Sequence, residues 1–195
     1  MSLITGIVLA AGASERMGES KLLLPYRGTT ILNATIKAVA SSRLDHLIVV
    51  TGAGAEAVEA SIEDQSVSIV RNPDFRRGNM SSLLTATDAD ADADAFVLVA
   101  GDLPAITREA INVVADLWTS DAPWAAVVEY SDRIAHPFLL SRAAIDETAA
   151  ITGTKVLWRS LVASEDPRVL RLPVSALAPA DINTPADYKD LLRDH

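Results

Sequence analysis

Four apolar runs divide the first half of the chain at regular intervals. They cover residues 4–10, 46–51, 67–71 and 95–100, each bounded by turn residues, and their length and composition predict buried strands. The stretches that follow them are amphipathic and predict helices, at 30–42, 54–64, 79–88 and 107–118. This alternation predicts a three-layer, Rossmann-like α/β fold, with an open, mostly parallel sheet and helices on both faces.

The pattern weakens after residue 120. Residues 124–130 and 137–140 predict strands of a more irregular region. Three helices are predicted at 142–149, 154–163 and 185–193, and Thr184 and Pro185 suit the cap and the first position of the last one. Because no linker or internal repeat interrupts the chain, residues 1–195 are predicted to form a single domain.

Glycine-rich or polar segments follow three of the predicted strands. They are the loop that begins near residue 11, residues 72–82 and residues 101–104. Ligands of open parallel sheets bind beyond the carboxyl ends of the strands. The three segments are therefore predicted to meet at one ligand site.

The loop after the first strand reads L-A-A-G-A-S-E-R-M-G-E-S-K-L-L-L-P over residues 9–25. Its small residues let the backbone approach a ligand closely, and two long cations, Arg16 and Lys21, follow them. This combination is suited to a nucleoside triphosphate. The glycine spacing excludes a P-loop, because five residues separate Gly12 from Gly18 and Lys21 does not follow Gly18 directly; no G-x-G-x-x-G is present either.

Asp102 lies directly after the strand predicted at 95–100, in the sequence G-D-L-P. Magnesium prefers oxygen ligands and usually takes one or two protein carboxylates together with phosphate oxygens. An aspartate at this place also suits a turn or the cap of the next helix. Its position beside the opening loop favours the metal-binding interpretation.

Composition narrows the classes of partner. The chain is 49% hydrophobic and 5% aromatic, which suits strands buried on both faces. Its net charge of −9 argues against general binding to nucleic acid or anionic membranes, so a bound triphosphate needs local cations and a divalent metal. The absence of cysteine excludes disulfides and thiolate metal sites.

The sequence shows no signal peptide and no apolar run long enough to span a membrane. A soluble cytoplasmic protein is therefore predicted.

An alternating Asp-Ala run covers residues 88–94. It suits either an acidic metal-binding patch or a solvated helix end and loop. Alternation divides the carboxylates between opposite sides of an extended chain, and therefore favours the solvated loop.

The pattern L-A-A-G-x-S-x-R-M-G-x-x-K resembles the signature loop of the MobA-like nucleotidyltransferases. The L-A-A-G form followed by L-L-L-P is more similar to the molybdenum cofactor cytidylyltransferases, whereas the guanylyltransferase branch more usually reads L-A-G-G. The resemblance covers residues 4 to about 192 and implies a sheet of the nucleotide-diphospho-sugar transferase type. The resemblance also implies that Lys21 neutralises the α-phosphate and that Arg16 binds the departing pyrophosphate.

The resemblance further implies which residues lie against the base and ribose. They are Leu9, Ala10, Ala11 and Gly12, and Ala11 is expected to favour cytosine over guanine.

Further segments carry the same resemblance. Residues 72–83, with N-P and then G-N-M-S-S-L, imply nucleotide contacts from Asn72 and Ser81, although both also suit a turn and a helix cap. Residues 181–187, D-I-N-T-P-A-D, imply a second metal ligand in Asp181, with the oxygen of Asn183 as a helper; a plain helix cap is the alternative. The A-H-P and G-T-K segments imply acceptor contacts, which would come from His136 and Lys155, and a structural histidine and a surface lysine are the alternatives.

Together these features predict a Mg²⁺-dependent nucleotidyltransferase in which Arg16, Lys21 and Asp102 are catalytic and Asp102 and Asp181 bind the metal. The resemblance implies transfer of CMP from CTP to the molybdenum–molybdopterin cofactor, with release of pyrophosphate. A molybdoenzyme is a candidate partner. The alternatives are a guanylyltransferase, a transferase acting on a sugar phosphate or phospholactate, and, from another class, a non-catalytic nucleotide-binding or cofactor-chaperone module.

Overall fold

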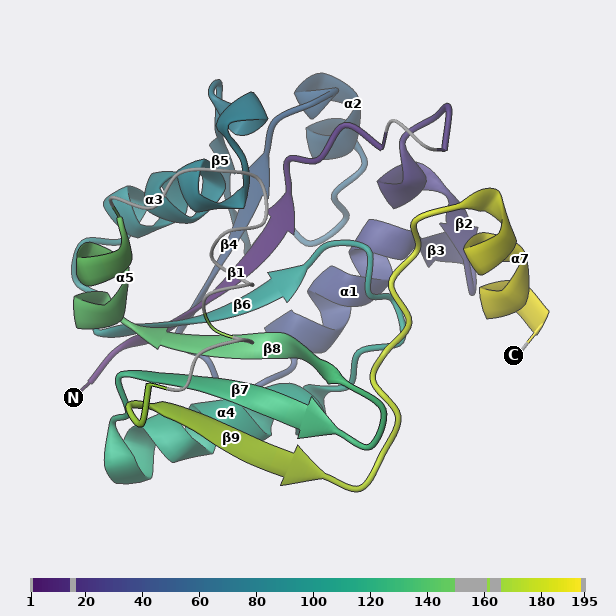
Figure 1. Cartoon of the computed structure of the whole chain (residues 1–195). Helices are drawn as coiled ribbons and strands as arrows, with labels where there is room; N and C mark the ends of the chain where they lie inside the picture. The colour runs from purple at the N-terminus through teal and green to yellow at the C-terminus, as the bar shows by residue number, and fades with distance from the viewer. Residues whose placement is uncertain (1, 15–16, 150–160, 162–165, 194–195) are drawn as a thin grey trace.

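A seven-stranded sheet forms the centre of the computed structural model, which describes residues 2–14, 17–149, 161 and 166–193 (Figure 1). The strand order is β5-β4-β1-β6-β8-β7-β9, and β8 alone among these strands runs antiparallel to its neighbours. The strands are β1 (Ile4–Ala10), β4 (His46–Thr51), β5 (Ser68–Arg71), β6 (Ala95–Ala100), β7 (Ala125–Tyr130), β8 (Ile134–Ser141) and β9 (Val169–Val174).

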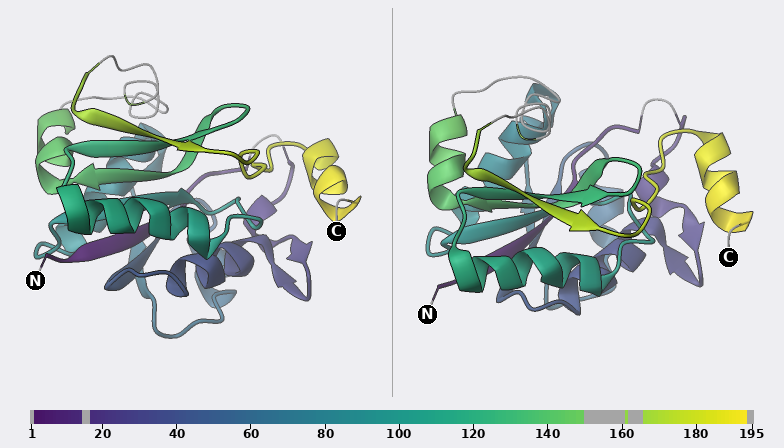
Figure 2. Two further views of the ribbon diagram at one scale, coloured as in Figure 1. Left: turned by 90° about the horizontal axis from the view of Figure 1, so that it is seen from below. Right: turned by 60° about the horizontal axis from the view of Figure 1, so that its bottom comes forward.

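Helices cover both faces of this sheet. The buried side chains of α1, α2 and α4 share one core cluster with one face, and those of α3 and α5 share a second cluster with the other. Figure 2 shows α1 and α4 together on the same side of the strands. Among the described residues, no helix combines the length and the apolar character needed to cross a bilayer. The helices are α1 (Ile31–Ala40), α2 (Ala55–Ala60), α3 (Asn79–Ala89), α4 (Arg108–Asp121), α5 (Arg142–Thr148) and α7 (Pro185–Arg193).

The central strands contribute to both cores. In β1, Ile7 packs beneath α3 and α5, whereas Val8 packs against the opposite helices. Successive side chains of a strand point to opposite faces, so a strand covered on both sides needs a continuous apolar run. This explains why residues 4–10 and 95–100 lack polar alternation. The predicted three-layer α/β fold is confirmed.

The second half departs from the prediction in two strands. Strand β8 begins at Ile134, three residues before the predicted run, and returns antiparallel from β7 through a tight turn. Strand β9 was not predicted, because it lies at the sheet edge and its exposed residues interrupt the apolar pattern. The helix predicted at 154–163 falls almost entirely outside the described residues.

The C-terminal helix α7 lies beside a small hairpin, β2 (Pro25–Tyr26) and β3 (Thr29–Thr30), that the sequence did not predict (Figures 1 and 2). The hydroxyl of Tyr188 donates a hydrogen bond to the carbonyl of Pro25 at 2.7 Å. Behind this contact lies a third apolar cluster, formed by Tyr26, Ile31, Ile182 and Leu191. The cluster holds the residues before α7 close to the carboxyl end of β1.

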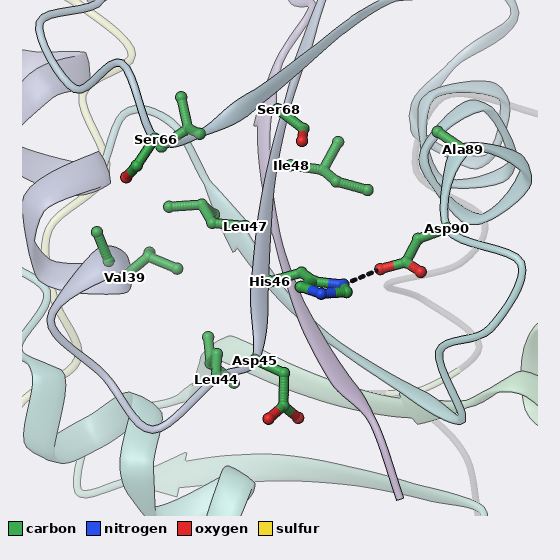
Figure 3. Close-up of a pocket in the computed structure, with 12 residues that line it drawn as sticks. Val39, Leu44, Asp45, His46, Leu47, Ile48, Ser66, Ser68, Ala89 and Asp90 are labelled. Carbon is green, nitrogen blue, oxygen red and sulfur yellow. Dashed lines mark hydrogen bonds and ion pairs between the residues drawn. The ribbon is translucent and has the colours of Figure 1, made fainter.

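The Asp-Ala run makes a specific contact at its centre. Asp90 accepts hydrogen bonds from Thr5 at 2.6 Å and from the ring of His46 at 2.9 Å, beside a hollow of about 510 Å³ at the start of β4 (Figure 3). The side chain of Asp90 is only 11% exposed. The prediction of a solvated loop is therefore wrong for Asp90, which links the end of α3 to β1 and β4.

The contact between His46 and Asp90 predicts a pH-dependent contribution to stability. The hydrogen bond and charge of Asp90 raise the pKa of His46 above its usual value, and Asp45 adds to this effect. A raised pKa in the folded state stabilises the protein below the unfolded-state pKa, and the contribution is lost as the pH rises through the folded-state pKa. Because His46 is more than half exposed, we expect His46→Gln to lower the free energy of unfolding by only about 0.2–1 kcal/mol near pH 5.5 and not near pH 9. Urea unfolding at both pH values measures this difference, and equal losses at the two would contradict the assignment.

Candidate active site

A cavity of about 1270 Å³ opens at the carboxyl ends of β1 and β6. Strand order reverses between these two strands, because the chain passes from β1 outward to β4 and β5 and then returns to β6 on the other side of β1. Such a switch point is where open α/β sheets bind their ligands. The cavity is lined by the opening loop, the segments after β4, β5 and β6, the turn between β7 and β8, and residues 179–183.

The opening loop is held in place through its backbone. Gly101 N donates to the carbonyl of Leu9 at 2.9 Å, and Ala53 N donates to the carbonyl of Ala11 at 3.1 Å. Three of the four residues predicted to contact base and ribose line the cavity, namely Leu9, Ala11 and Gly12. The fourth, Ala10, is 1% exposed and packs in the core beneath α1 and α4.

Hydrogen bonds of Ser14 help to position Lys21 at the cavity. Ser14 adopts a positive φ of 51°, its carbonyl accepts a hydrogen bond from Met17 N, and its hydroxyl accepts one from Lys21 N at 3.3 Å. Lys21 then opens the short 3₁₀ helix η1 (Lys21–Leu23), in which Leu22 is buried in the core. The burial of Leu22 fixes the turn from which Lys21 reaches the cavity. Arg16 lies outside the described residues.

The ammonium group of Lys21 meets oxygens from two distant segments. Its Nζ lies 2.5 Å from Asp102 Oδ2, 2.6 Å from the carbonyl oxygen of Ile182 and 3.5 Å from Asn183 Oδ1. The side chains of Lys21 and Asp102 are 17% and 13% exposed, so this ion pair is largely shielded from water. The structure thus brings together the two residues that the sequence places at the ends of different strands.

Asp102 is fixed by the turn that follows β6. The carbonyl of Gly101 accepts a hydrogen bond from the buried Thr35 hydroxyl at 3.1 Å, and Leu103 is 3% exposed. A Cβ at residue 101 would lie 3.0 Å from the carbonyl oxygen of Leu9, so glycine permits the close approach of the two strand ends. Residues on both sides of Asp102 are therefore anchored while its carboxylate faces the cavity.

Asp181 approaches the same cavity from the segment before α7. Ile182 is buried in the third cluster, and its neighbours Asp181 and Asn183 line the cavity. The amide Nδ2 of Asn183 donates to Asp181 Oδ2, and a guanidinium nitrogen of Arg133 lies 3.6 Å from Asp181 Oδ1. Asp181 is thus linked to Arg133 directly and to Lys21 through the side chain of Asn183.

The helix cap of this segment is made by Thr184, as predicted, together with Asp187. The hydroxyl of Thr184 accepts from Asp187 N at 3.2 Å, and the carboxylate of Asp187 accepts from Thr184 N at 2.7 Å. This reciprocal arrangement is a capping box. Because Thr184 and Asp187 complete it, Asp181 is not required as a cap.

The oxygens around Lys21 fit a divalent cation. Carboxylate, amide and carbonyl oxygens are the ligands that Mg²⁺ and similar ions prefer. In the described part of the chain, no group of three or more Asp, Glu, His or Cys side chains has the arrangement to hold a metal by itself. A metal here would therefore depend on the carboxylates of Asp102 and Asp181 together with neutral or ligand oxygens.

Asn72 and Ser81 lie beside the cavity, with their side chains engaged in local contacts. The Nδ2 of Asn72 donates to the hydroxyls of Ser81 and Ser82, both at 3.0 Å, and its Oδ1 accepts from Asp74 N at 2.9 Å. The Ser81 hydroxyl in turn donates to the carbonyl of Gly78 at 2.8 Å. These bonds hold the start of α3, while Ser82 lines the cavity itself. A nucleotide contact from Asn72 or Ser81 stays a prediction.

His136 lines the cavity, next to a cis peptide bond to Pro137. Its Nδ1 lies 3.0 Å from the carbonyl oxygen of Leu98, and its ring packs 4.5 Å from that of Phe138. Burial lowers the pKa of His136, against the opposing influence of the Leu98 carbonyl and of the charges on Asp102 and Asp181. Burial of the ring therefore favours its neutral form. Lys155, the other predicted acceptor contact, lies outside the described residues.

Arg133 is the main cavity residue that the sequence analysis missed. It lies in the turn between β7 and β8, donates to the carbonyl of Pro179 at 3.0 Å and lies close to Asp181. The signal in the sequence was a cation three positions before His136. The place of Arg133 at the cavity depends on β8 running antiparallel to β7, and the apolar pattern did not predict that direction.

An open α/β sheet that carries paired lysine and aspartate side chains at its switch point is suited to binding a phosphorylated ligand there. A sequence profile described as the MobA-like NTP transferase domain matches residues 6–169. The chain therefore belongs to the MobA-like NTP transferase family and is a nucleotidyltransferase.

Named relatives lie in both nucleotide branches. The chain is 34% identical over 143 residues to the molybdenum cofactor cytidylyltransferase of Escherichia coli K12, covering 73% of this chain and 72% of that one. It is 30% identical over 197 residues to a probable molybdenum cofactor guanylyltransferase of Mycobacterium avium, covering 96% and 94%. The crystal structure of Rv0371c from Mycobacterium tuberculosis H37Rv superimposes with a TM-score of 0.88 at 35% identity, with 98% of each chain covered. A second structure of Rv0371c is a complex with manganese.

Proposed function

We propose that this protein transfers CMP from CTP to a terminal phosphate of the molybdenum–molybdopterin cofactor and releases pyrophosphate, with Mg²⁺ as its metal. The observation that carries the proposal is the shielded pair of Lys21 and Asp102 at the switch point of the sheet. It provides one cation for phosphate and one carboxylate for a metal in the same cavity. A relative named molybdenum cofactor cytidylyltransferase supports the choice of nucleotide and acceptor.

The reaction is an in-line displacement at the α-phosphorus. An oxygen of the acceptor phosphate forms the new P–O bond, and the bond between the α-phosphorus and the bridging oxygen breaks, so that pyrophosphate leaves with the electron pair. Transfer of this kind depends on alignment and on neutralisation of charge more than on a side-chain nucleophile. Lys21 is a compact point charge suited to the α-phosphate.

Asp102 and Asp181 are the residues proposed to hold the metal. When bound, a divalent ion supplies a Lewis acid that orients phosphate oxygens and offsets their charge. The chain supplies the rest of the alignment: Gly101 and Leu103 fix Asp102, and Ile182 fixes the segment of Asp181. Arg16 is proposed to bind the departing pyrophosphate.

We divide the cavity into two lobes by the segments that line it, one lobe for each substrate. One is lined by the small residues of the opening loop and by the segments after β4 and β5, which leave room for a base and ribose. The other is lined by the turn between β7 and β8, where His136 and Arg133 lie. We assign the first lobe to CTP and the second to the acceptor, with Lys21 and Asp102 between them.

The alternative retained is guanylyl transfer. A relative named probable molybdenum cofactor guanylyltransferase matches almost the whole chain, so GTP is the principal competing donor. Ala11 favours CTP, because it lines the cavity where the resemblance places the base, and the guanylyltransferase branch more usually has glycine at this position.

Pyrophosphate release measured with CTP, GTP, ATP and UTP, with and without molybdenum–molybdopterin, tests the proposal. We expect release that depends on the acceptor and on Mg²⁺ and that has its highest kcat/KM with CTP, by at least about tenfold, a difference of about 1.4 kcal/mol. Higher kcat/KM with GTP would replace the proposed donor. No release with any of the four triphosphates in the presence of molybdopterin would overturn the acceptor.

A further inference from the structure

Lys21 occupies a position that resembles that of a bound metal ion. Its Nζ lies within 2.6 Å of two oxygens, Asp102 Oδ2 and the Ile182 carbonyl, and 3.5 Å from a third, Asn183 Oδ1. The three oxygens come from segments about 80 residues apart in sequence. They converge on one cation, and oxygens of these types are also the ligands of a divalent ion.

Lys21 is already paired at this position. Its ammonium faces the carboxylate of Asp102 at 2.5 Å, whereas Asp181 lies 3.6 Å from Arg133, which is itself paired with Asp132 at 2.8 Å. A divalent ion bound to Asp102 while Lys21 stays in place would meet the ammonium of Lys21 at close range, and this pair is largely shielded from water. Like charges at such distances repel strongly where water is excluded.

We infer that Lys21 and the divalent ion compete for the same oxygens, so that the ion binds tightly only when a triphosphate draws Lys21 away from Asp102. The inference rests on the proposed function, because it takes Lys21 as a phosphate ligand and Asp102 as a metal ligand. A triphosphate supplies the negative charge that the ion requires and gives the ammonium of Lys21 new partners. Metal and nucleotide therefore bind as a mutually dependent pair.

The competition predicts an unusual effect of one neutral substitution. Lys21→Met keeps the length of the side chain and removes its charge, which leaves the oxygens of Asp102, Ile182 and Asn183 without their cation. We expect Lys21→Met to bind Mn²⁺ in the absence of nucleotide at least about tenfold more tightly than the wild type. Electron paramagnetic resonance measures this directly, because the signal of free Mn²⁺ falls as the ion binds.

Three variants control the experiment. Lys37→Met makes the same chemical change at an exposed position of α1 and is expected to bind Mn²⁺ as the wild type does. Lys21→Arg keeps the positive charge and is expected to keep Mn²⁺ binding weak. The double variant Lys21→Met with Asp102→Asn is expected to lose the gain, because the carboxylate that attracts the ion is gone.

The outcomes separate the inference from the proposed function. Mn²⁺ binding by Lys21→Met that equals or falls below that of the wild type overturns the competition, as does equal strengthening in Lys21→Arg. Far-UV circular dichroism of each variant verifies that the fold is retained.

If the expected order of Mn²⁺ affinities is found while no triphosphate releases pyrophosphate, the competition stands and the proposed reaction fails. If CTP turns over while Lys21→Met shows no gain, the reaction stands and the competition fails.

Discussion

Replacing Asp102 with Asn is expected to lower kcat for pyrophosphate release by about 10²–10³-fold, the effect of removing one electrostatic group from a transition state. The substitution preserves the shape of the side chain and removes one negative charge that faces Lys21 at 2.5 Å. Without that charge the site loses its proposed metal ligand and the counter-charge that positions Lys21. Steady-state assays at saturating CTP and acceptor give the change in kcat.

The fold should survive this substitution. Lys21 Nζ still has the carbonyl of Ile182 and Asn183 Oδ1 as acceptors, and the buried Leu103 and Gly101 still fix the turn. We expect the free energy of unfolding to fall by no more than about 1–3 kcal/mol, the cost of one charged hydrogen bond. Asp88→Asn, the same change at an exposed position of α3, serves as the matched control and should keep full activity. Full activity of Asp102→Asn would end the assignment of Asp102 as a metal ligand.

The first half of the fold was predictable because its strands are buried on both faces. Ile7 and Val8 enter different cores, so β1 had to be apolar throughout, and the run was visible without any neighbour. The same reasoning located Lys21 and Asp102. Each follows a strand that the sequence identifies, and parallel strands end at the same edge of a sheet.

Strand β9 could not be predicted in this way. It lies at the edge, where Leu170 is 37% exposed and Arg171 pairs with Glu129 at the surface, so exposed residues interrupt its apolar run. The position of Arg133 depends on how β8 turns back beside β6, and tertiary packing rather than local sequence determines that pairing. Asp181 was reached only through the family resemblance, since its approach to the cavity depends on Ile182 docking against the β2–β3 hairpin and α1.

Asn72 shows a different kind of limit. The sequence placed it correctly at the end of β5, where a base or ribose contact is a reasonable prediction. The structure shows that the amide donates to Ser81 and Ser82 and accepts from Asp74 N. An amide has the same donors and acceptors whether its partner is a ligand or a loop, so the residue type did not distinguish the two. The contacts indicate that Asn72 shapes the wall formed by η2 (Phe75–Arg77) and the start of α3.

The tightest backbone contact in this wall gives the second large prediction. A Cβ added at Gly52 would lie 2.7 Å from the Cβ of Phe75, 2.8 Å from the Cβ of Ala11 and 3.0 Å from the Ala11 carbonyl oxygen. These atoms belong to or adjoin the backbone, so they cannot move aside by a change of rotamer. We expect Gly52→Ala to displace the opening loop from η2, to lower the free energy of unfolding by about 1–3 kcal/mol and to raise the KM for CTP.

Gly12→Ala separates the two parts of this prediction. A Cβ at Gly12 would meet nothing within 4 Å, so thermal unfolding should be unchanged, although the new methyl group faces the proposed nucleotide lobe. Gly52→Ala should instead lower Tm by several degrees, as a loss of this size does in a protein of about 200 residues. We expect KM to increase in both variants and Tm to decrease only in Gly52→Ala. The increase in Gly52→Ala would then reflect the displaced loop, and the increase in Gly12→Ala would reflect the close approach of the backbone to the nucleotide. Wild-type Tm and KM in Gly52→Ala would show that the contact of Gly52 with Ala11 and Phe75 does not set the geometry of the nucleotide lobe.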